Sequence, residues 1–552
     1  MAFLFAPADP SSSPIRRHAL SINPVFALGC LFVALRLIHL DSTYVQGDDW
    51  FTLGTLRGLD WPNLLPATVD YVSTMITGPF LPTLLDRVLI KLFGPNLVIL
   101  RLPSLLTALG GFYLLHRILE RLFTSPAARL FPLVLFTFSV PSIIYAQQIQ
   151  PSIYYFFTTV LQVFVFLKLL PRDNAPPDFG RMVRDLLILA QTTVACFLLN
   201  YMSLLIFGLL TGIYVLRALF QSEAARARLA VLFKGAGIAL FAALPLAILA
   251  LLRILSGSEH QGLVRDYLHR FYIDTPSDIP PLVYDFLAYH FNFAYDQALY
   301  TQMGANWLSL PFVLLCLFGG VVYCWGGIRR LAYLGFGLAL LFVAVRVRMM
   351  PFGGLRHTFT IVPFVYLLLA GAVDHFAKPG NGSGQARKKT ALAVVAGFCL
   401  FMLALFLVSG SSLYSKRNTR VDLETLVALA GETGARTVLL YEDSIAAIYM
   451  HNLTQGDVLG KAGISLATFT PEVNKAFQGP YLLATQYYLI NPGPEWRWAH
   501  WRVDIPLESF DHKAVTPLVQ DNGGVDVRTM GMQTIYSPVN GFYVYLVRPA
   551  DP

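Results

Sequence analysis

Charged residues are scarce in this sequence. Only 13% of its 552 residues are Asp, Glu, Lys or Arg, and 55% are hydrophobic, whereas a soluble domain is ordinarily about a quarter charged. The hydrophobic residues gather in long runs, and runs of about 18 or more are typical of membrane-spanning helices. Because backbone groups in lipid must be satisfied within each segment, we expect a polytopic α-helical membrane protein.

Cysteine is rare as well, and its positions exclude two kinds of site. The five cysteines all lie in apolar runs without metal-ligand spacing, so we interpret them as small membrane residues and not as disulfides. The net charge of +8 does not indicate nucleic-acid binding, because the basic residues mostly fall in short loops between apolar runs. We find no internal repeat.

The apolar runs predict about 11 spans within a membrane domain at residues 21–410. Residues 1–20 are interpreted as a cytoplasmic tail. The first span is too long for a signal-peptide core and lacks an Ala-x-Ala site, so it should be retained. Arg36 lies near its outer end and is expected to reach the interface. The spans are predicted at residues 22–40, 97–115, 130–145, 153–170, 186–200, 202–220, 235–255, 307–327, 331–345, 358–376 and 390–409.

Basic loops on one side of these spans place the N-terminus in the cytoplasm, and an odd number of spans places the C-terminus outside. Two long outer loops are expected at residues 41–95 and 256–305. Residues 411–552 have ordinary polarity and turn signals, and they predict a soluble α/β domain on the outer face. Within it we expect a helix at 420–433 and strands at 437–441, 481–484 and 542–547.

Two adjacent acids, Asp48 and Asp49, follow the first span. A partly buried carboxylate in this aromatic and apolar loop would have a raised pKa and suit general-base catalysis. An ordinary solvated pair in a loop is the alternative that these residues leave open.

Further polar groups are predicted on the same face. Arg346, Arg348 and Arg356 lie at the outer ends of two spans, the last beside His357. Arginine binds phosphate through its planar fork, although a single arginine here could equally extend to lipid phosphates. Tyr145, Gln148 and Gln150 flank an outer turn. Their phenol and amide groups suit sugar hydroxyls, but such groups are also ordinary in turns.

The order of these motifs resembles the GT-C class of membrane glycosyltransferases. The resemblance rests on the acid pair, on Leu-Arg-Leu-Pro-Ser at residues 100–104, on the segment at 139–152, and on Arg-His-Thr-Phe at 356–359. It extends over roughly residues 20–380. The sequence is most similar to bacterial enzymes related to protein O-mannosyltransferases and to the lipid A aminoarabinose transferase.

The resemblance implies roles for single residues. Asp48 matches the catalytic base, and Asp49 replaces the usual Glu; it would orient Asp48, contact the acceptor or hold a metal. Arg356, Arg346 and Arg348, with Arg101 as a weaker candidate, would stabilise the donor phosphate. Where the family turn commonly has Glu and Arg, this chain has Gln148 and Gln150, so an acid and a base are lost together.

The function implied is that of an inverting glycosyltransferase on the outer face of a bacterial inner (plasma) membrane. It would move a sugar from a polyprenyl-phosphate donor to a hydroxyl of an acceptor glycan, lipid or protein. No cofactor is required, although a divalent metal is compatible with the scheme. The alternative is a non-catalytic protein on the same scaffold that binds or transports lipid-linked sugars; the changed turn residues keep this alternative open.

Overall fold

The computed structural model describes most of the helical region and part of the C-terminal region. The described residues are 23–41, 61–68, 80–149, 152–170, 179–221, 271–291, 310–325, 328–347, 350–353, 356–377, 419–440, 456–468, 479–485, 513–517 and 543–549, with isolated positions at 230, 234, 235, 237, 393, 396–398, 400, 401, 403, 404, 406, 407 and 452.

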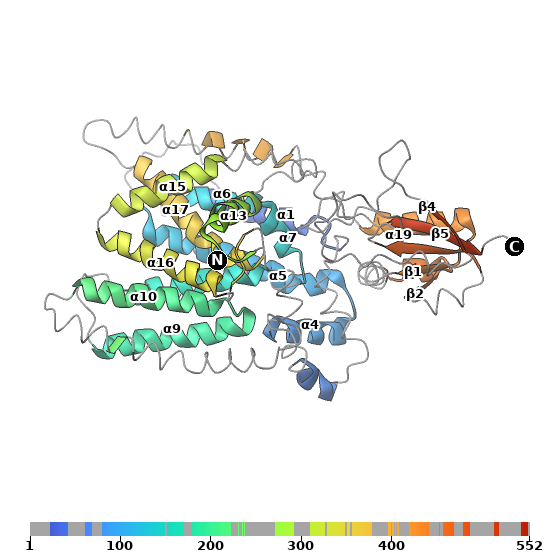
Figure 1. Ribbon diagram of the computed structural model, residues 1–552, viewed down its shortest axis with the longest axis horizontal. Helices are drawn as coiled ribbons and strands as arrows, with labels where there is room; N and C mark the ends of the chain where they lie inside the picture. The colour runs from blue at the N-terminus through green and yellow to red at the C-terminus, as the bar shows by residue number, and fades with distance from the viewer. Residues whose placement is uncertain are drawn as a thin grey trace, which may run out of the picture.

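A bundle of apolar helices forms the larger part of the molecule (Figure 1). Its helices are α1 (Pro24–Leu37), α4 (Phe80–Phe93), α5 (Leu97–Leu122), α6 (Pro126–Phe138), α7 (Val140–Ala146), α8 (Ser152–Leu169), α9 (Phe179–Leu199), α10 (Ser203–Gln221), α13 (Ile279–His290), α15 (Leu310–Trp325), α16 (Ile328–Arg346) and α17 (Val362–Ala377). Short 3-10 turns are η1 (Trp61–Asn63), η3 (Pro276–Asp278) and η5 (Arg356–Thr360).

Each predicted span that falls within the described residues coincides with one of these helices or with the pair α6 and α7. Five described helices are long and apolar enough to cross a membrane, or six if that bent pair is one span. Helices α1 and α17 are apolar but shorter. The predicted spans at 235–255 and 390–409 lie largely outside the described residues, so the total of 11 stays a prediction.

The pair α6 and α7 bends by 63° where the sequence predicts one span. Ser139 lies at the break, and its Oγ accepts a 3.4 Å hydrogen bond from the Ser142 amide, as an N-cap does. Pro141 in the first turn of α7 suits a new helix start. The preceding helix is held by aromatic packing, with the rings of Phe136 and Phe156 stacked at 4.2 Å.

Helix α13 and η3 lie within the second predicted outer loop. Leu282 and Phe286 on α13 are buried in the main core, and Phe286 stacks on Phe352 with ring centroids 5.2 Å apart. The Phe352 amide donates to the Phe271 carbonyl at 2.8 Å. This part of the loop is therefore packed against the bundle.

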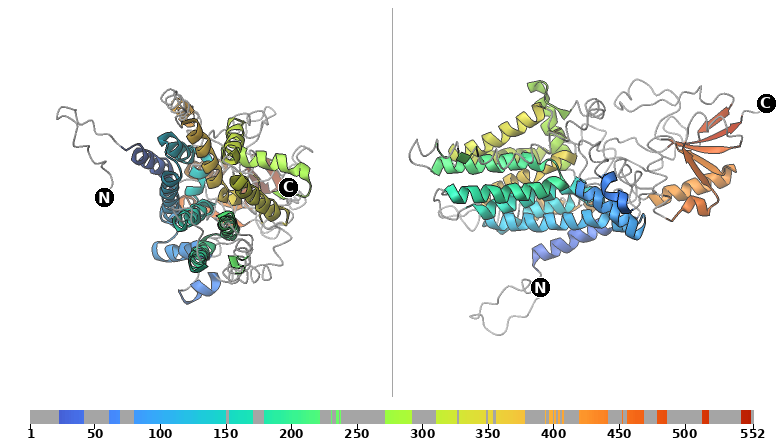
Figure 2. Two further views of the ribbon diagram at one scale, coloured as in Figure 1. Left: turned by 90° about the vertical axis from the view of Figure 1, so that its left-hand side faces the viewer. Right: turned by 90° about the horizontal axis from the view of Figure 1, so that it is seen from below.

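The C-terminal elements form a five-stranded mixed sheet beyond one end of the bundle (Figures 1 and 2). The order is β2-β1-β3-β5-β4, parallel where β1 pairs with β2 and β3, and antiparallel where β5 pairs with β3 and β4. Its elements are α19 (Thr419–Thr433), β1 (Thr437–Leu440), α21 (Val458–Lys461), β2 (Ser465–Thr468), β3 (Tyr481–Thr485), β4 (Lys513–Pro517) and β5 (Tyr543–Pro549).

The sheet has a core of its own. Leu423 and Leu426 of α19 cluster with Leu440 of β1, Leu459 of α21 and Leu482 of β3. This separate cluster supports a domain boundary near residue 411, which stays a prediction together with the sidedness of the domain.

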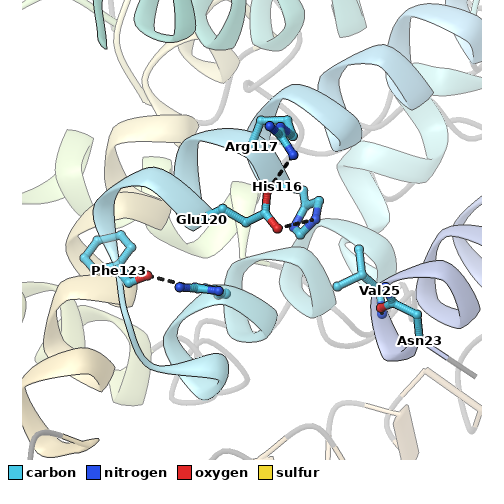
Figure 3. A network of polar contacts seen from close by, with 7 residues as sticks. Asn23, Val25, His116, Arg117, Glu120 and Phe123 are labelled. Carbon is cyan, nitrogen blue, oxygen red and sulfur yellow. Dashed lines mark hydrogen bonds and ion pairs between the residues drawn. The ribbon is translucent and has the colours of Figure 1, made fainter. Parts of the chain in front are cut away.

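Figure 3 shows a polar network near the last turns of α5. Glu120 lies 2.9 Å from Arg117 and 3.4 Å from the His116 ring. In the same region the Arg129 guanidinium donates to the Phe123 carbonyl at 2.8 Å. The sequence predicts this basic end of α5 to be cytoplasmic, and its sidedness stays a prediction.

Candidate functional site

The candidate site lies at the end of the bundle that three chain segments form: residues 145–149 at the end of α7, the turn 200–202 between α9 and α10, and η5. We call this the turn end. Figures 1 and 2 show the C-terminal sheet beyond the side of the bundle where α4 and α7 lie.

Arg36 of α1 is fully buried, so the expectation that its side chain reaches the interface is wrong. Its guanidinium donates to the carbonyls of Phe136 at 2.9 Å and Thr137 at 3.3 Å, and to Ser142 Oγ at 2.7 Å. The bend between α6 and α7 frees these carbonyls from helical partners. Arg36 stays inside the bundle because its guanidinium, with five N–H donors, can hydrogen-bond the carbonyls left unpaired where α6 ends.

The chain after α1 is tied to the same end. The Gln147 side-chain amide donates to the carbonyls of Arg36 at 3.1 Å and Ile38 at 2.9 Å. The buried Arg101 guanidinium donates to the Leu40 carbonyl at 2.6 Å. These bonds fix the point from which the loop carrying Asp48 and Asp49 departs.

Two further polar contacts join α7, α13 and η5. The hydroxyls of Tyr145 and Tyr289 lie 2.7 Å apart, and His290 Nε2 lies 2.6 Å from Thr358 Oγ1. Thr358 Oγ1 also donates to the Gly353 carbonyl at 2.9 Å. Sequence reasoning missed Tyr289, His290 and Thr358, because their partners lie in segments far apart in the chain.

His357 is enclosed by aromatic rings. Its ring centroid lies 5.5 Å from that of Tyr155 and 6.3 Å from that of Tyr201. Asn200, the neighbour of Tyr201, ties this turn to α8, since its Nδ2 donates to Thr158 Oγ1 at 3.2 Å. Burial, and secondarily the charge of Arg356, lowers the pKa of His357 from 6.5 to about 3. The imidazole is therefore neutral at physiological pH.

Gln148 and His357 are buried without hydrogen-bond partners among the described residues. Neither the oxygen nor the nitrogen of the Gln148 amide has one, although the side chain is fully buried. Both ring nitrogens of His357 are likewise buried and have no hydrogen-bond partner among the described residues. A buried polar group left unpaired ordinarily costs about 1–3 kcal/mol. Such groups call for a specific explanation, and a bound ligand is one.

The arginines predicted to bind phosphate occupy different environments. Arg356 is half-buried at the start of η5, beside His357. Arg346 is exposed, with a guanidinium nitrogen 3.7 Å from an Asp274 carboxylate oxygen, and an exposed pair of this kind contributes little to stability. The structure therefore gives Arg101 a backbone partner and Arg346 a surface acid. The predicted residues Asp48, Asp49, Arg348 and Gln150 lie outside the described residues.

Among the described residues, no group of three or more His, Cys, Asp or Glu side chains is arranged to hold a metal ion. Asp49, the predicted metal ligand, is not among them.

Comparison with solved structures identifies the fold. The chain is similar to ArnT from Cupriavidus metallidurans in its apo state, with a TM-score of 0.50 and 12% identity over 95% of this chain and 98% of that one. It is also similar to the same ArnT bound to undecaprenyl phosphate (TM-score 0.48, 11% identity, 95% and 97% covered). A third similar structure is the Archaeoglobus fulgidus oligosaccharyltransferase (TM-score 0.42, 11% identity, 80% and 64% covered).

No protein-family model matches the chain, and no curated protein matches it by sequence. At this level of identity the likeness to apo ArnT speaks for the fold and not for the chemistry. The resemblance predicted from the sequence motifs is thus confirmed for the fold: this chain has the fold of a GT-C membrane glycosyltransferase.

Proposed function

We propose that this protein is an inverting glycosyltransferase that uses a polyprenyl-phosphate sugar. One observation carries the proposal: the loop with the acid pair begins at the turn end, where Arg356 lies and where Gln148 and His357 are buried with no hydrogen-bond partner in the described part of the chain. An acid, a cation and neutral polar groups would then share one site at the end of an apolar bundle. ArnT, whose apo form has this fold, has been solved with undecaprenyl phosphate, a polyprenyl phosphate of the kind that would leave in the proposed reaction.

The proposed reaction needs only groups of this chain. Asp48 accepts the proton of the acceptor hydroxyl as that oxygen attacks the anomeric carbon. The bond from the anomeric carbon to the phosphate oxygen breaks, and polyprenyl phosphate leaves with the electron pair. Attack opposite the leaving group inverts the anomeric configuration. Arg356 stabilises the charge that develops on the phosphate, with Arg348 and Arg346 as further candidates.

Other residues would position this chemistry. Arg101 and Gln147 hold the end of α1, from which the acid pair follows. Asp49 would orient Asp48, contact the acceptor or bind a divalent ion. The C-terminal sheet would lie on the outer face of the inner membrane and dock the acceptor. Trp496, Trp498 and Trp501, which lie outside the described residues, are candidate surfaces for stacking on sugar rings.

Release of polyprenyl phosphate tests the function. The full-length protein in lipid nanodiscs is supplied with undecaprenyl-phosphate hexose and a membrane extract as acceptor, and free undecaprenyl phosphate is measured over time. We expect release that depends on both protein and acceptor. The alternative of a binding protein or transporter predicts donor binding without release under any acceptor condition.

The two described arginines near the site make a matched pair. Arg356→Gln removes a half-buried cation beside the unpartnered imidazole, so we expect the KM for the donor to rise by tenfold or more, equivalent to about 1.4 kcal/mol. Arg346→Gln removes an exposed cation that already faces Asp274, so its effect should be a few-fold at most. Equal effects would contradict the proposed order of the two arginines.

A further inference from the structure

The side-chain amide of Gln148 is a polar group that the described fold does not use for hydrogen bonding. The side chain is fully buried, and neither amide atom has a hydrogen-bond partner among the residues that the structure describes. The preceding residue, Gln147, uses its amide to hold the end of α1. The two adjacent glutamines therefore differ in role. The Gln147 amide binds the backbone at the end of α1, whereas the Gln148 amide has a donor and an acceptor available for a ligand.

His357 offers the same pair of functions from the facing segment. A neutral imidazole donates through one nitrogen and accepts through the other. Both nitrogens of His357 are buried and have no hydrogen-bond partner within the described part of the chain. The segments of the two residues pack on each other. The Tyr145 ring, three residues before Gln148, lies 5.0 Å from Phe359, and the Tyr155 ring lies 5.5 Å from His357.

Neither of these two groups is charged. A cationic sugar amine is best held by a carboxylate and an anionic sugar by a guanidinium, because charge-assisted hydrogen bonds are roughly twice as strong as neutral ones. Sugar hydroxyls both donate and accept, so they satisfy an amide and an imidazole completely. An ammonium group can only donate, and it would leave the amide nitrogen of Gln148 without a partner.

We infer that Gln148, together with His357, selects a donor whose transferred sugar is uncharged, and that it rejects amino sugars and uronic acids. This inference rests on the proposed function and narrows it from any lipid-linked sugar to neutral ones. The selection works through unmet hydrogen bonds, because a site built to bind hydroxyls strongly rejects a ligand that leaves its polar groups unpaired.

Three donors that differ in sugar charge test the inference. Undecaprenyl phosphate carrying glucose, glucosamine or glucuronic acid is supplied to the full-length protein in nanodiscs together with the membrane extract as acceptor, and kcat/KM for release of the lipid phosphate is measured. We expect the glucose donor to be preferred at least tenfold over both others. Gln148→Met should reduce kcat/KM for glucose about tenfold, and Gln148→Glu should shift the preference toward glucosamine. Gln191→Met, at an exposed position of α9, is the matched control and should behave as wild type.

Several outcomes overturn the inference. Equal use of glucose and glucosamine by the wild type, or unchanged selectivity in both Gln148 variants, removes the assigned role while the proposed function stands. If no donor is turned over, the proposed function fails. Donor binding is then measured instead of kcat/KM, as the shift of the unfolding temperature when each donor is added. A larger shift of the unfolding temperature with the glucose donor, lost in Gln148→Met, still supports recognition of a neutral sugar. Equal shifts with all donors, or no shifts, contradict the inference.

Discussion

At the scale of single residues, Arg36 is the side chain whose role changed most between sequence and structure. An arginine near the end of an apolar span is expected to extend its side chain to the membrane surface. Its partners lie about a hundred positions later in the chain, at the break between α6 and α7. Sequence neighbours could not show this contact, because it depends on how two spans pack. The general signal was present, since an ionisable residue within a span is seldom there without a purpose.

Arg36→Met should destabilise the folded protein substantially. The change leaves the carbonyls of Phe136 and Thr137 buried without their donor, and a loss of about 3–5 kcal/mol is typical when one partner of a buried charged network is removed. Thermal unfolding in detergent measures it. Arg117→Met removes an exposed ion pair with Glu120 and should cost no more than about 1 kcal/mol. Similar losses in both variants would mean that Arg36 does not hold the bend.

His357 predicts a pH dependence of stability. Its folded pKa, about 3, lies below its usual value of 6.5, so between these values the unfolded chain binds more protons than the folded one. The stability that neutral His357 permits is complete above pH 6.5 and falls as the pH drops, by up to about 1.4 kcal/mol per pH unit. His357→Asn should flatten the decline of the unfolding temperature between pH 6.5 and pH 5. An unchanged pH profile in this variant would contradict the assigned environment.

The candidate site was predictable in part. The motif that ends in Arg356 and His357 and the turn with Gln148 pointed to one end of the protein, and the structure brings these segments together through Tyr145, Phe359 and Tyr155. The sequence could not show that both atoms of Gln148 are left free, because burial and the absence of a partner are properties of the packed fold. The position of Asp48 relative to these residues remains a prediction.

At the scale of elements, apolar runs located the spans well but not their shape. Residues 130–145 read as one span because their composition is uniformly apolar, whereas Ser139 and Pro141 mark a helix end and a new start. Helix α13 was missed within a predicted outer loop, since its polar and aromatic residues resemble those of a surface segment. Its burial depends on Phe352 and the core behind it.

Close packing between α15 and α17 predicts different responses at two adjacent glycines. A Cβ on Gly319 would lie 2.5 Å from the Leu368 carbonyl oxygen, whereas one on Gly320 would meet nothing within 4 Å. Gly319→Ala should therefore destabilise the bundle by about 1–3 kcal/mol, because the two helices must separate. Gly320→Ala should be neutral or stabilise by up to about 1 kcal/mol. Detergent unfolding curves compare them, and the reverse order would refute this packing.

At the scale of the whole molecule, the C-terminal sheet shows which strands local sequence patterns can predict and which they cannot. The strands at β1, β3 and β5 were expected from short apolar runs, and the helix at α19 from its periodicity. Strands β2 and β4 were not predicted. β2 has exposed and half-buried positions and no continuous apolar run, so it becomes recognisable only through its parallel pairing with β1.

The proposed orientation can be tested by labelling. Glu432 is exposed on α19, and Arg117 is exposed at the far end of α5. In intact cells, a membrane-impermeant maleimide should label Glu432→Cys and leave Arg117→Cys unlabelled, with the unmodified protein as the background. Lysed cells should allow labelling of both. Labelling of Arg117→Cys alone in intact cells would reverse the orientation and move the proposed site to the cytoplasmic face.

In the proposed reaction, an acid from the loop after α1 reaches the turn end and removes a proton from the acceptor. The rate at which Asp48→Asn releases undecaprenyl phosphate, relative to wild type, tests this most directly. Asp41→Asn, an exposed acid at the start of the same loop, serves as the control. We predict a loss of at least a hundredfold in kcat for Asp48→Asn, as expected for a general base, with donor binding preserved and Asp41→Asn close to wild type. Equal rates in wild type and Asp48→Asn would contradict the account.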